Sequence, residues 1–539
     1  MAVTKNQEYT VTVEGYSGEG AGVARIDGFV VFVSGALRGE VCRILILKVL
    51  KSAAFAKVLE VLAPSPHRIT PDCPYFPRCG GCTYRHMDYA EELALKRRRV
   101  QDNLARIGGS EVEVEEILGA AETRRYRNKA QYPVSPDGRV GFYRARTHEV
   151  IDTRECLLVK PEADAAAEAV RQYMRDFRAA GYDERTGRGL LRHVYVRSNT
   201  KGESLICLLV NGKRLPHEAE LVERLRRACP KAVGIVLGEN TRRDNVILGE
   251  RYRTLWGADR LEDALCGRVF RLSVPSFYQV NHEQAERLYA KAIEYAQLTG
   301  EETVLDLYCG AGTITLALTS HAKRVLGAEI VPEAIDDARE NTARSGVENA
   351  EFFCGDASDV AKKLAQENLR PDVITVDPPR KGLAEDVVES IARMQPERVV
   401  YVSCDSATMA RDVKRFAALG YRAVRACAVD LFPRADHVET VCLLSKLQSK
   451  EHIEIEVKMD ELDLTSAESK ATYEEIKAYV LEHTGLKVSH LYIAQVKQKY
   501  GIIERENYNK PKSENAKQPQ CPPEKEEAIT EALKHFGMI

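Results

Sequence analysis

Four short apolar segments in the second half of the chain are each followed by residues able to bind a ligand or react with it. They are residues 303–308, 324–328, 372–376 and 398–402. Such runs are typical of strands buried on both faces of a parallel sheet. The carboxyl ends of these strands meet along one edge of an open α/β sheet, where ligands bind. We therefore predict a Rossmann-like α/β domain whose site collects the residues after these strands.

The length and composition indicate several domains in one cytoplasmic chain. The 539 residues suffice for three or four domains, and no apolar run is long enough to cross a bilayer. The first ten residues lack the apolar core of a secretory signal. We expect no membrane partner, and the 14 cysteines should be thiols or metal ligands rather than disulfides. The net charge of −2 neither favours nor excludes a nucleic-acid partner.

The first 62 residues alternate short strand-like segments with glycine turns. The segments are 9–13, 22–26, 29–33, 40–47 and 54–62. Strands this short and numerous favour a small β-barrel of the oligonucleotide-binding (OB) kind. Composition alone fits any small barrel, including one that only packs on its neighbours.

A cysteine cluster opens the next region, which mixes helices and strands from residue 63 to 263. Cys73, Cys79 and Cys82 lie in a Pro/Gly-rich loop and can converge on one metal centre, with Cys156 as the candidate fourth ligand. Four thiolates suit either zinc or an iron–sulfur cluster, and the spacing does not choose between them. Arg125–Lys129 mixes basic and aromatic residues, which suits RNA but equally a solvent-facing strand.

The turn after residue 308 is a candidate nucleotide-type site. Gly310 and Gly312 allow close approach of a ligand to the backbone, and Glu329 follows the next strand, where an acid can bind both hydroxyls of a ribose. The glycine pattern alone fits many nucleotide-binding folds. It lacks a third glycine and a Lys-Ser/Thr pair, so S-adenosylmethionine fits better than a dinucleotide or a nucleoside triphosphate.

A cysteine and two carboxylates complete the pattern. Cys404 follows a strand and is either a small buried residue or a nucleophile. Asp377 precedes two prolines, and Arg380 stands where amino-group methyltransferases carry an aromatic residue. With Glu439 as a base, these residues suit methylation of an unreactive pyrimidine carbon: the thiolate adds to C6, C5 attacks the methyl donor, and the base removes the C5 proton.

Five motifs carry a resemblance to a known family. They are SFYQVN, LDLYCGAGT, DPPRKGL, SCDSATMARD and DLFPRADHVETV, in this order. Over residues 1 to about 446 the chain resembles the RNA 5-methyluridine methyltransferases, and EGYSGEGAGVARIDGFVVFVSGALRGE resembles their TRAM domain. The resemblance implies Cys404 as nucleophile and Glu439 as proton acceptor. It also implies donor-binding roles for Gln279, Tyr308, Thr313, Glu329 and Asp377, although many members have Asn where this chain has Thr313.

The resemblance extends to the cysteines and to the RNA target. It implies that Cys73, Cys79, Cys82 and Cys156 hold a [4Fe-4S] cluster. Barrel and cluster together resemble the members that act on 23S ribosomal RNA, whereas transfer-RNA members typically lack both. Two alternatives remain: the same chemistry on tRNA, and an RNA-binding protein that keeps the fold without catalysis.

The expected architecture is a multidomain α/β monomer with four parts. They are an OB-like TRAM barrel (1–62), a central α+β domain with the iron–sulfur loop (63–263), a class I methyltransferase domain (264–447) and an α-rich extension (448–539). In the extension we predict a strand at 452–457, helices at 473–483 and 489–500, and a terminal helix. The first two helices suit a helix-turn-helix module or a packing appendage equally well.

Overall fold

The protein, seen here in a computed structural model, divides into two compact units, Met1–Ser449 and Lys450–Ile539. The structure describes residues 3–447, 473–500, 521–536 and 538. Within these residues, no helix combines the length and the apolar character that a membrane crossing needs. The two units are described separately below.

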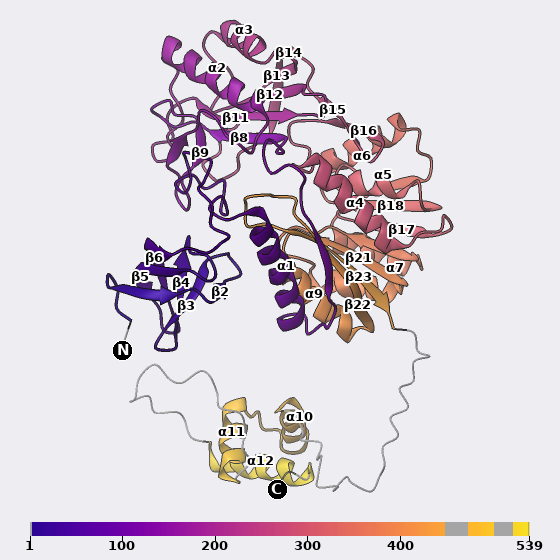
Figure 1. The fold of residues 1–539 in the computed structure, drawn as a ribbon. Helices are drawn as coiled ribbons and strands as arrows, with labels where there is room; N and C mark the ends of the chain where they lie inside the picture. Colours follow the sequence, from indigo (N-terminus) through magenta and orange to yellow (C-terminus); the bar gives the residue numbers. More distant parts are fainter. Residues whose placement is uncertain (1–2, 448–472, 501–520, 537, 539) are drawn as a thin grey trace. The chain divides into compact units, whose positions relative to one another are not determined.

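Six strands form the N-terminal sheet of the first unit (Figure 1). They are β1 (Glu8–Thr12), β2 (Gly15–Tyr16), β3 (Gly22–Ile26), β4 (Phe29–Ser34), β5 (Val41–Val49) and β6 (Ala53–Ala63). Their order is β1-β5-β6-β4-β3-β2, and β1 also contacts β3, so the sheet curls strongly. Asp27 and Gly28 join β3 to β4 with φ of 49° and 81°, the two-residue hairpin turn that matches strand twist.

A second sheet occupies the central region, with helices on one face. Its order is β14-β13-β12-β11-β8, and a small hairpin of β9 and β10 lies beside it. The bounds are β8 (Lys129–Pro133), β9 (Gly141–Tyr143), β10 (Val150–Asp152), β11 (Leu191–Ser198), β12 (Ser204–Val210), β13 (Ala232–Glu239) and β14 (Arg251–Gly257). Helices α2 (Pro161–Phe177) and α3 (Glu218–Ala228) bury their apolar faces against this sheet.

The largest sheet has eight strands in the order β19-β18-β17-β20-β21-β23-β22-β7. They are β7 (Val114–Leu118), β17 (Thr303–Leu307), β18 (Arg324–Glu329), β19 (Ala350–Cys354), β20 (Val373–Val376), β21 (Arg398–Ser403), β22 (Tyr421–Val429) and β23 (Glu439–Lys446). Strands β17 to β21 pair in parallel, as their continuous apolar runs predict. The hairpin of β15 (Leu261–Leu265) and β16 (Arg268–Leu272) precedes the sheet.

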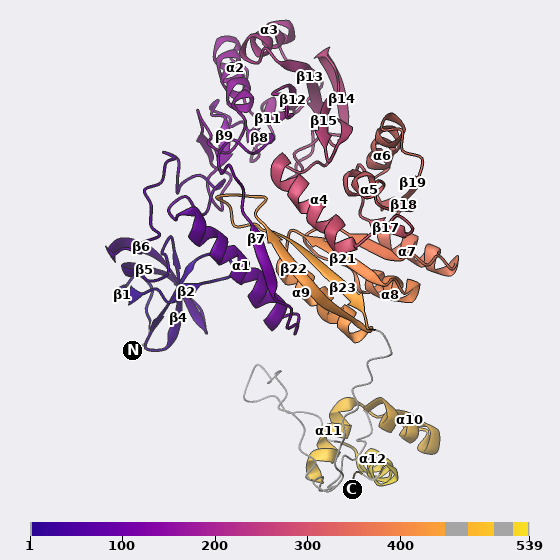
Figure 2. The ribbon, with the colours of Figure 1, turned by 45° about the vertical axis from the view of Figure 1, so that its right-hand side comes forward.

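Helices cover both faces of this sheet (Figure 2). They are α1 (Tyr89–Arg106), α4 (His282–Ala296), α5 (Thr313–Leu318), α6 (Pro332–Arg344), α7 (Ala357–Gln366), α8 (Glu385–Met394) and α9 (Ser406–Ala418). Residues of α1, α7, α8 and α9 share one apolar core with the sheet, and those of α4 and α5 share another.

Two elements that precede the central sheet pack on the eight-stranded one. We expected α1 in the central region, and the sequence pattern did not reveal β7. The structure pairs β7 in parallel with β22 at the edge of the largest sheet and packs α1 against α9. The polypeptide therefore ties this sheet to a segment more than 300 positions upstream.

In the described residues of the second unit, three helices surround one apolar core. They are α10 (Tyr473–Thr484), α11 (His490–Lys499) and α12 (Pro523–His535). Gly485, with φ of 69°, follows α10, and the Ser489 side chain caps α11 by accepting a hydrogen bond from the Tyr492 amide at 3.3 Å. The helices expected here are present, whereas the strand expected at 452–457 lies outside the described residues.

Candidate active site

Cys404 and Glu439 meet at the edge of the eight-stranded sheet. Strands β21 and β23 are antiparallel neighbours, and Ser403 pairs with Thr440 at the end of their ladder. Cys404 follows Ser403 and Glu439 precedes Thr440, so the two functional residues stand opposite each other. The register of two strands therefore brings together residues 35 positions apart that we selected from sequence.

Asp377 joins this pair from the neighbouring strand β20. Strands β20 and β21 are parallel with Val376 opposite Tyr401, so the residue after β20 emerges at the same edge. Burial, the nearby Asp377 and a smaller opposing effect of Arg380 together raise the pKa of Glu439 to about 8. Burial and then Asp306 raise the pKa of Asp377 to about 7. Two carboxyls that hold protons near neutral pH are typical of a catalytic site.

The Cys404 thiol is half-buried between β21 and α9. Burial, followed by Glu439 and Asp377, raises its pKa to about 11, while Arg380 acts in the opposite direction. The next residue, Asp405, caps α9 by accepting hydrogen bonds from the amides of Ala407 and Thr408 at 2.9 and 3.0 Å. The cap fixes the backbone directly after the thiol.

The glycine turn after β17 is held in a left-handed conformation next to Glu329. Tyr308, Gly310 and Gly312 have φ of 68°, 55° and 80°. The Gly310 amide donates to the Glu329 carboxylate at 3.2 Å, which joins the turn to the end of β18. A Cβ on Gly312 would lie 3.2 Å from the Ala338 Cβ, so both the space and the φ favour glycine here.

Two buried groups behind this turn were missed by sequence reasoning. Asp306 accepts hydrogen bonds from the hydroxyls of Thr315 at 2.6 Å and Thr375 at 2.8 Å, and burial raises its pKa to about 6. The hydroxyls of Tyr289 and Thr313 lie 2.9 Å apart, so Thr313 is joined to α4. An acidic residue in the middle of a buried strand was the only available signal for Asp306.

Gln279 lies in the segment before α4. It is buried, and its carbonyl oxygen accepts a hydrogen bond from the Asn128 side chain at 2.9 Å. Asn281 in the same segment donates to the Leu431 carbonyl at 3.2 Å. The segment therefore connects the start of β8 to the loop that precedes Glu439.

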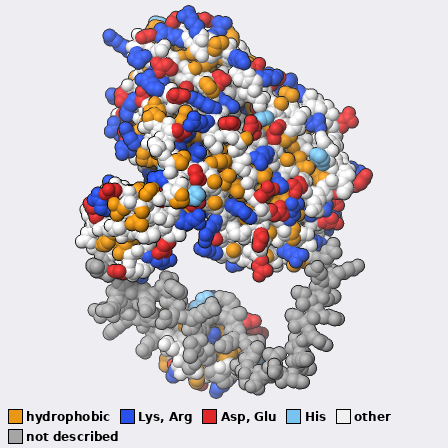
Figure 3. Space-filling view, in the orientation of Figure 1, with side chains coloured by type: hydrophobic (Ala, Val, Ile, Leu, Met, Phe, Trp, Pro, Cys, Tyr) orange, Lys and Arg blue, Asp and Glu red, His pale blue; other side chains and the backbone are white. Residues whose placement is uncertain are grey.

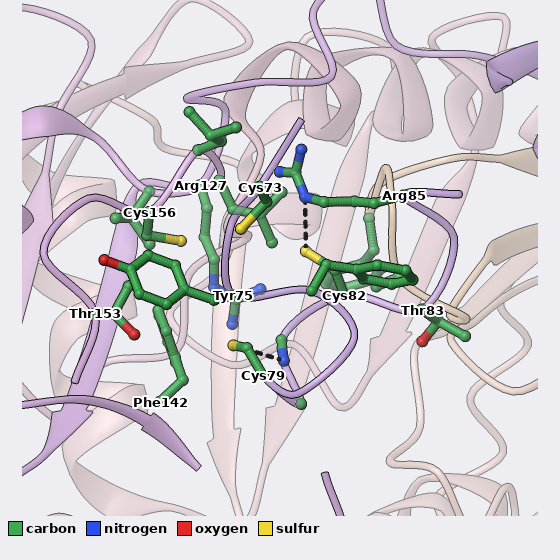
Figure 4. A pocket seen from close by; sticks show the side chains of 18 of the residues that line it. Cys73, Tyr75, Cys79, Cys82, Thr83, Arg85, Arg127, Phe142, Thr153 and Cys156 are labelled. Atoms are coloured by element: carbon green, nitrogen blue, oxygen red, sulfur yellow. Dashed lines mark hydrogen bonds between the residues drawn. The ribbon is translucent and has the colours of Figure 1, made fainter. Parts of the chain in front are cut away.

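The four expected cysteine ligands line one pocket. Its volume is about 340 Å³, and Figure 4 shows the sulfur atoms of Cys73, Cys79, Cys82 and Cys156 placed around it. Arg85 donates to the Cys82 sulfur at 3.2 Å. Burial raises the pKa of Cys79, Cys82 and Cys156; neighbouring thiols add smaller contributions at Cys79 and Cys82, and Asp164 does so at Cys156. Sequence reasoning therefore selected four cysteines that the fold brings together.

The arrangement of these thiols bears on the kind of metal they could hold. In the described part of the chain, no three His, Cys, Asp or Glu side chains are grouped tightly enough to hold a metal ion. Four thiolates around one zinc ion stand about 3.8 Å apart, given a Zn–S distance of about 2.3 Å. Thiolates that bind the separate irons of a cluster stand farther apart. The structure shows four thiols lining one pocket, and among the described residues it shows no group of side chains close enough together to hold a metal ion.

The cysteine pocket borders the catalytic residues. Arg380 and His437 line it together with the thiols, and the Arg380 guanidinium lies 3.0 Å from the His437 imidazole. Arg380 also influences the pKa of both Cys404 and Glu439. The two sites that we identified separately in the sequence thus share one side chain.

Fold and site together define an α/β methyltransferase-type domain with a thiol beside carboxylates. The family model described as tRNA (Uracil-5-)-methyltransferase matches residues 88–447, and the TRAM domain model matches residues 2–59. The chain therefore belongs to the tRNA (uracil-5-)-methyltransferase family and carries a TRAM domain.

Relatives and one solved structure agree with this assignment. An RNA methyltransferase of Clostridium tetani is 41% identical over 83% of this chain and 98% of its own length. One from Halalkalibacterium halodurans is 44% identical over 82% of this chain and 98% of its own length. The Pyrococcus abyssi tRNA (uracil-54, C5)-methyltransferase, solved with S-adenosyl-L-homocysteine, is 26% identical with a TM-score of 0.66, over 81% of this chain and all of that one.

Proposed function

We propose that this protein transfers a methyl group from S-adenosylmethionine to C5 of uracil in RNA. The observation that carries the proposal is the placement of Cys404 opposite Glu439, with Asp377 and Arg380 beside them. A thiol and a carboxyl at one strand end provide the nucleophile and the base that C5 methylation needs. The Pyrococcus abyssi enzyme was solved with S-adenosylhomocysteine, which is what remains of S-adenosylmethionine after the methyl group is transferred.

In the proposed reaction Cys404 acts as the nucleophile and Glu439 as the base. The Cys404 sulfur, after losing its proton, adds to C6 of uracil, and the electron pair released toward C5 makes that carbon nucleophilic. S-adenosylmethionine, when bound, supplies the methyl group that C5 takes. Ionised Glu439 then removes the C5 proton, and the C6–S bond breaks to release the Cys404 thiolate. Asp377 would hydrogen-bond the uracil edge or the donor.

The donor would lie on the glycine turn, because the turn offers an open backbone beside a carboxylate. Glu329 would bind the ribose hydroxyls, and Gln279, Tyr308, Thr313 and Asp377 would line the rest of the pocket. The left-handed turn at Gly310 and Gly312 supports this placement. Ala338 and Phe352 pack closely against Gly312, so a side chain at this position would crowd the turn.

We assign 23S ribosomal RNA as the substrate. The TRAM domain and the four-cysteine pocket support this choice, because their combination is similar to that of the ribosomal members. A hollow in the central region suits an RNA backbone, because five arginines outnumber the two aspartates that line it: Arg139, Arg154, Arg171, Arg175 and Arg178 against Asp137 and Asp152. Figure 3 shows Lys and Arg gathered at the upper left of the molecule. The Pyrococcus abyssi enzyme acts on tRNA by its name, so tRNA is the alternative target.

We also assign a [4Fe-4S] cluster to the pocket of Cys73, Cys79, Cys82 and Cys156. All four thiols face one cavity, and Arg85 is hydrogen-bonded to one sulfur, where it would balance thiolate charge. The cluster would order the loop between the TRAM sheet and α1. On this proposal residues 1–62 and 63–263 bind RNA, residues 264–447 carry out the reaction, and the chain acts as a monomer.

Trapping on 5-fluorouridine RNA tests the chemistry. Fluorine at C5 cannot leave as a proton, so the methylated adduct persists and the protein migrates with RNA in a denaturing gel. The wild type should form this complex and Cys404→Ala should not, whereas Cys354→Ala, at an exposed cysteine outside the site, should behave as the wild type. A Cys404→Ala protein that still methylates RNA would refute the mechanism. A wild type without a covalent complex would favour the alternative of a non-catalytic RNA-binding protein.

Mapping of 5-methyluridine in cells with and without the gene tests the target. We expect one or more 23S ribosomal positions to lose the modification and tRNA to keep it. Loss from tRNA alone would overturn the ribosomal assignment and leave the chemistry intact.

A further inference from the structure

The loop that leads into Glu439, residues 430–438, is anchored by a buried group of charges on α1. Lys96 is fully buried, and its ammonium donates to Glu92 at 2.8 Å, to Asp430 at 2.7 Å and to the Phe432 carbonyl at 3.1 Å. Glu92 and Asp430 are also fully buried. Tyr89 completes the group by donating to Asp430 at 2.7 Å. Figure 2 shows α1 alongside β22, the strand that ends where this loop begins.

Three further segments hold the same loop. The Arg434 carbonyl accepts the amides of Thr83 and Tyr84 at 2.8 and 3.1 Å, directly after the cysteine segment. The Tyr126 hydroxyl donates to the Pro433 carbonyl at 3.0 Å. The Gln284 side chain donates to the Asp430 carbonyl at 3.0 Å. A loop with this many anchors has its conformation set by other segments rather than by its own sequence.

The anchored loop lies directly before the residue proposed as the base. Glu439 is the first residue of β23, directly after the loop, and its carboxyl lies at the reaction edge. Proton removal requires the base within hydrogen-bond reach of the C5 proton, and a misplacement of about 1 Å can cost about 100-fold in rate. Cys404, by contrast, is carried by β21 and α9. In the described residues, the hydrogen bonds of Lys96 and Tyr89 run to Glu92 and to the loop, whereas α1 meets α9 elsewhere, through packing and through the bond from Asn103 to Ser406 at 2.9 Å.

We infer that Lys96, through its bonds to Asp430 and the Phe432 carbonyl, is a positioning residue for the base and acts selectively on the proton-removal step. The inference rests on the proposed function. Loosening the loop should leave thiol addition and methyl transfer nearly unchanged and should slow removal of the C5 proton. The methylated covalent intermediate would then accumulate on ordinary uridine RNA, without fluorine to trap it.

The test uses three variants of the full-length protein. Lys96→Met removes the cation that Glu92 and Asp430 share, so two buried carboxyls lose their strongest common partner, which can prevent folding. Tyr89→Phe and Tyr126→Phe each remove one hydroxyl that reaches the loop or Asp430 and leave the buried charges in place. Tyr173→Phe is the matched control, because its buried hydroxyl donates to the Pro216 carbonyl in the central region.

Two rates are measured on uridine RNA: formation of the covalent complex in a single turnover, and release of tritium from C5 at steady state. For the folded variants that loosen the loop, we expect covalent-complex formation within about twofold of the wild type. Tritium release should be slower by about tenfold, so the covalent band should build up. The Tyr173→Phe control should match the wild type. Glu439→Gln supplies the reference for a fully stalled intermediate.

Two results would contradict the inference, and a different result would contradict the proposed function. If both rates fall together in the Tyr89→Phe and Tyr126→Phe proteins, the loop anchors only maintain folding, and the inference is wrong. If neither rate changes in either protein, the anchors do not position the base, and the inference is also wrong. Failure of the wild type to form a complex on 5-fluorouridine RNA would instead refute the proposed function.

Discussion

Replacing Glu439 by glutamine should stabilise the folded chain above neutral pH while it abolishes turnover. The pKa of Glu439 is about 8 in the folded state, against an ordinary value of 4.5, with burial as the main cause. Between these two values the folded chain binds a proton that the unfolded chain has lost. The free energy of unfolding therefore falls as pH rises through this window.

The size of the effect follows from the width of the window. Each pH unit costs about 1.4 kcal/mol, so ionised Glu439 lowers the stability by about 5 kcal/mol above pH 8. Glutamine keeps the shape and cannot ionise. The variant should equal the wild type near pH 4.5, become progressively more stable than it up to about pH 8, and keep a constant advantage beyond.

Urea unfolding at several pH values measures this difference. Glu348→Gln is the matched control, because Glu348 is exposed to solvent. The unfolding free energy of this variant should follow that of the wild type at every pH. Parallel pH profiles for the wild type and Glu439→Gln would refute the reasoning, because they would show that Glu439 ionises alike in the folded and unfolded chains.

Three further outcomes follow from the site. The turnover rate should rise with pH through about pH 8 as Glu439 loses its proton, and a flat profile from about pH 6 to pH 9 would contradict its role as base. Gly312→Ala, at φ of 80° and against Ala338, should weaken donor binding about tenfold in calorimetry, while unchanged affinity would show that the turn does not touch the donor. Cys156→Ser should lower the iron and sulfide content of anaerobically purified protein, and zinc in the wild type would contradict the cluster.

The main elements of the site could be predicted because chemistry and strand ends coincide in the sequence. Cys404 and Asp377 each follow an apolar run, and parallel strands deliver such residues to one edge. To predict that Cys404 stands opposite Glu439, one must also know that β23 pairs antiparallel with β21. No local pattern reports which strand a terminal strand will join.

Other features could not be predicted, because they depend on distant partners. Lys96 sits in a run of basic residues that looks solvent-exposed, yet it is fully buried against Asp430, 334 positions away. Strand β7 carries two glutamates among its five residues and lacks the apolar run of the other strands, so only its pairing with β22 makes it a strand.

The raised pKa of Cys404 has a consequence for the resting protein. With a pKa of about 11, about one thiol in ten thousand is ionised at pH 7, and it is the thiolate that peroxides and alkylating agents attack. The same burial and neighbouring carboxyls that delay ionisation therefore shield the sulfur from oxidation between catalytic cycles. On the proposed mechanism, the Cys404 thiol would therefore stay protonated in the resting protein.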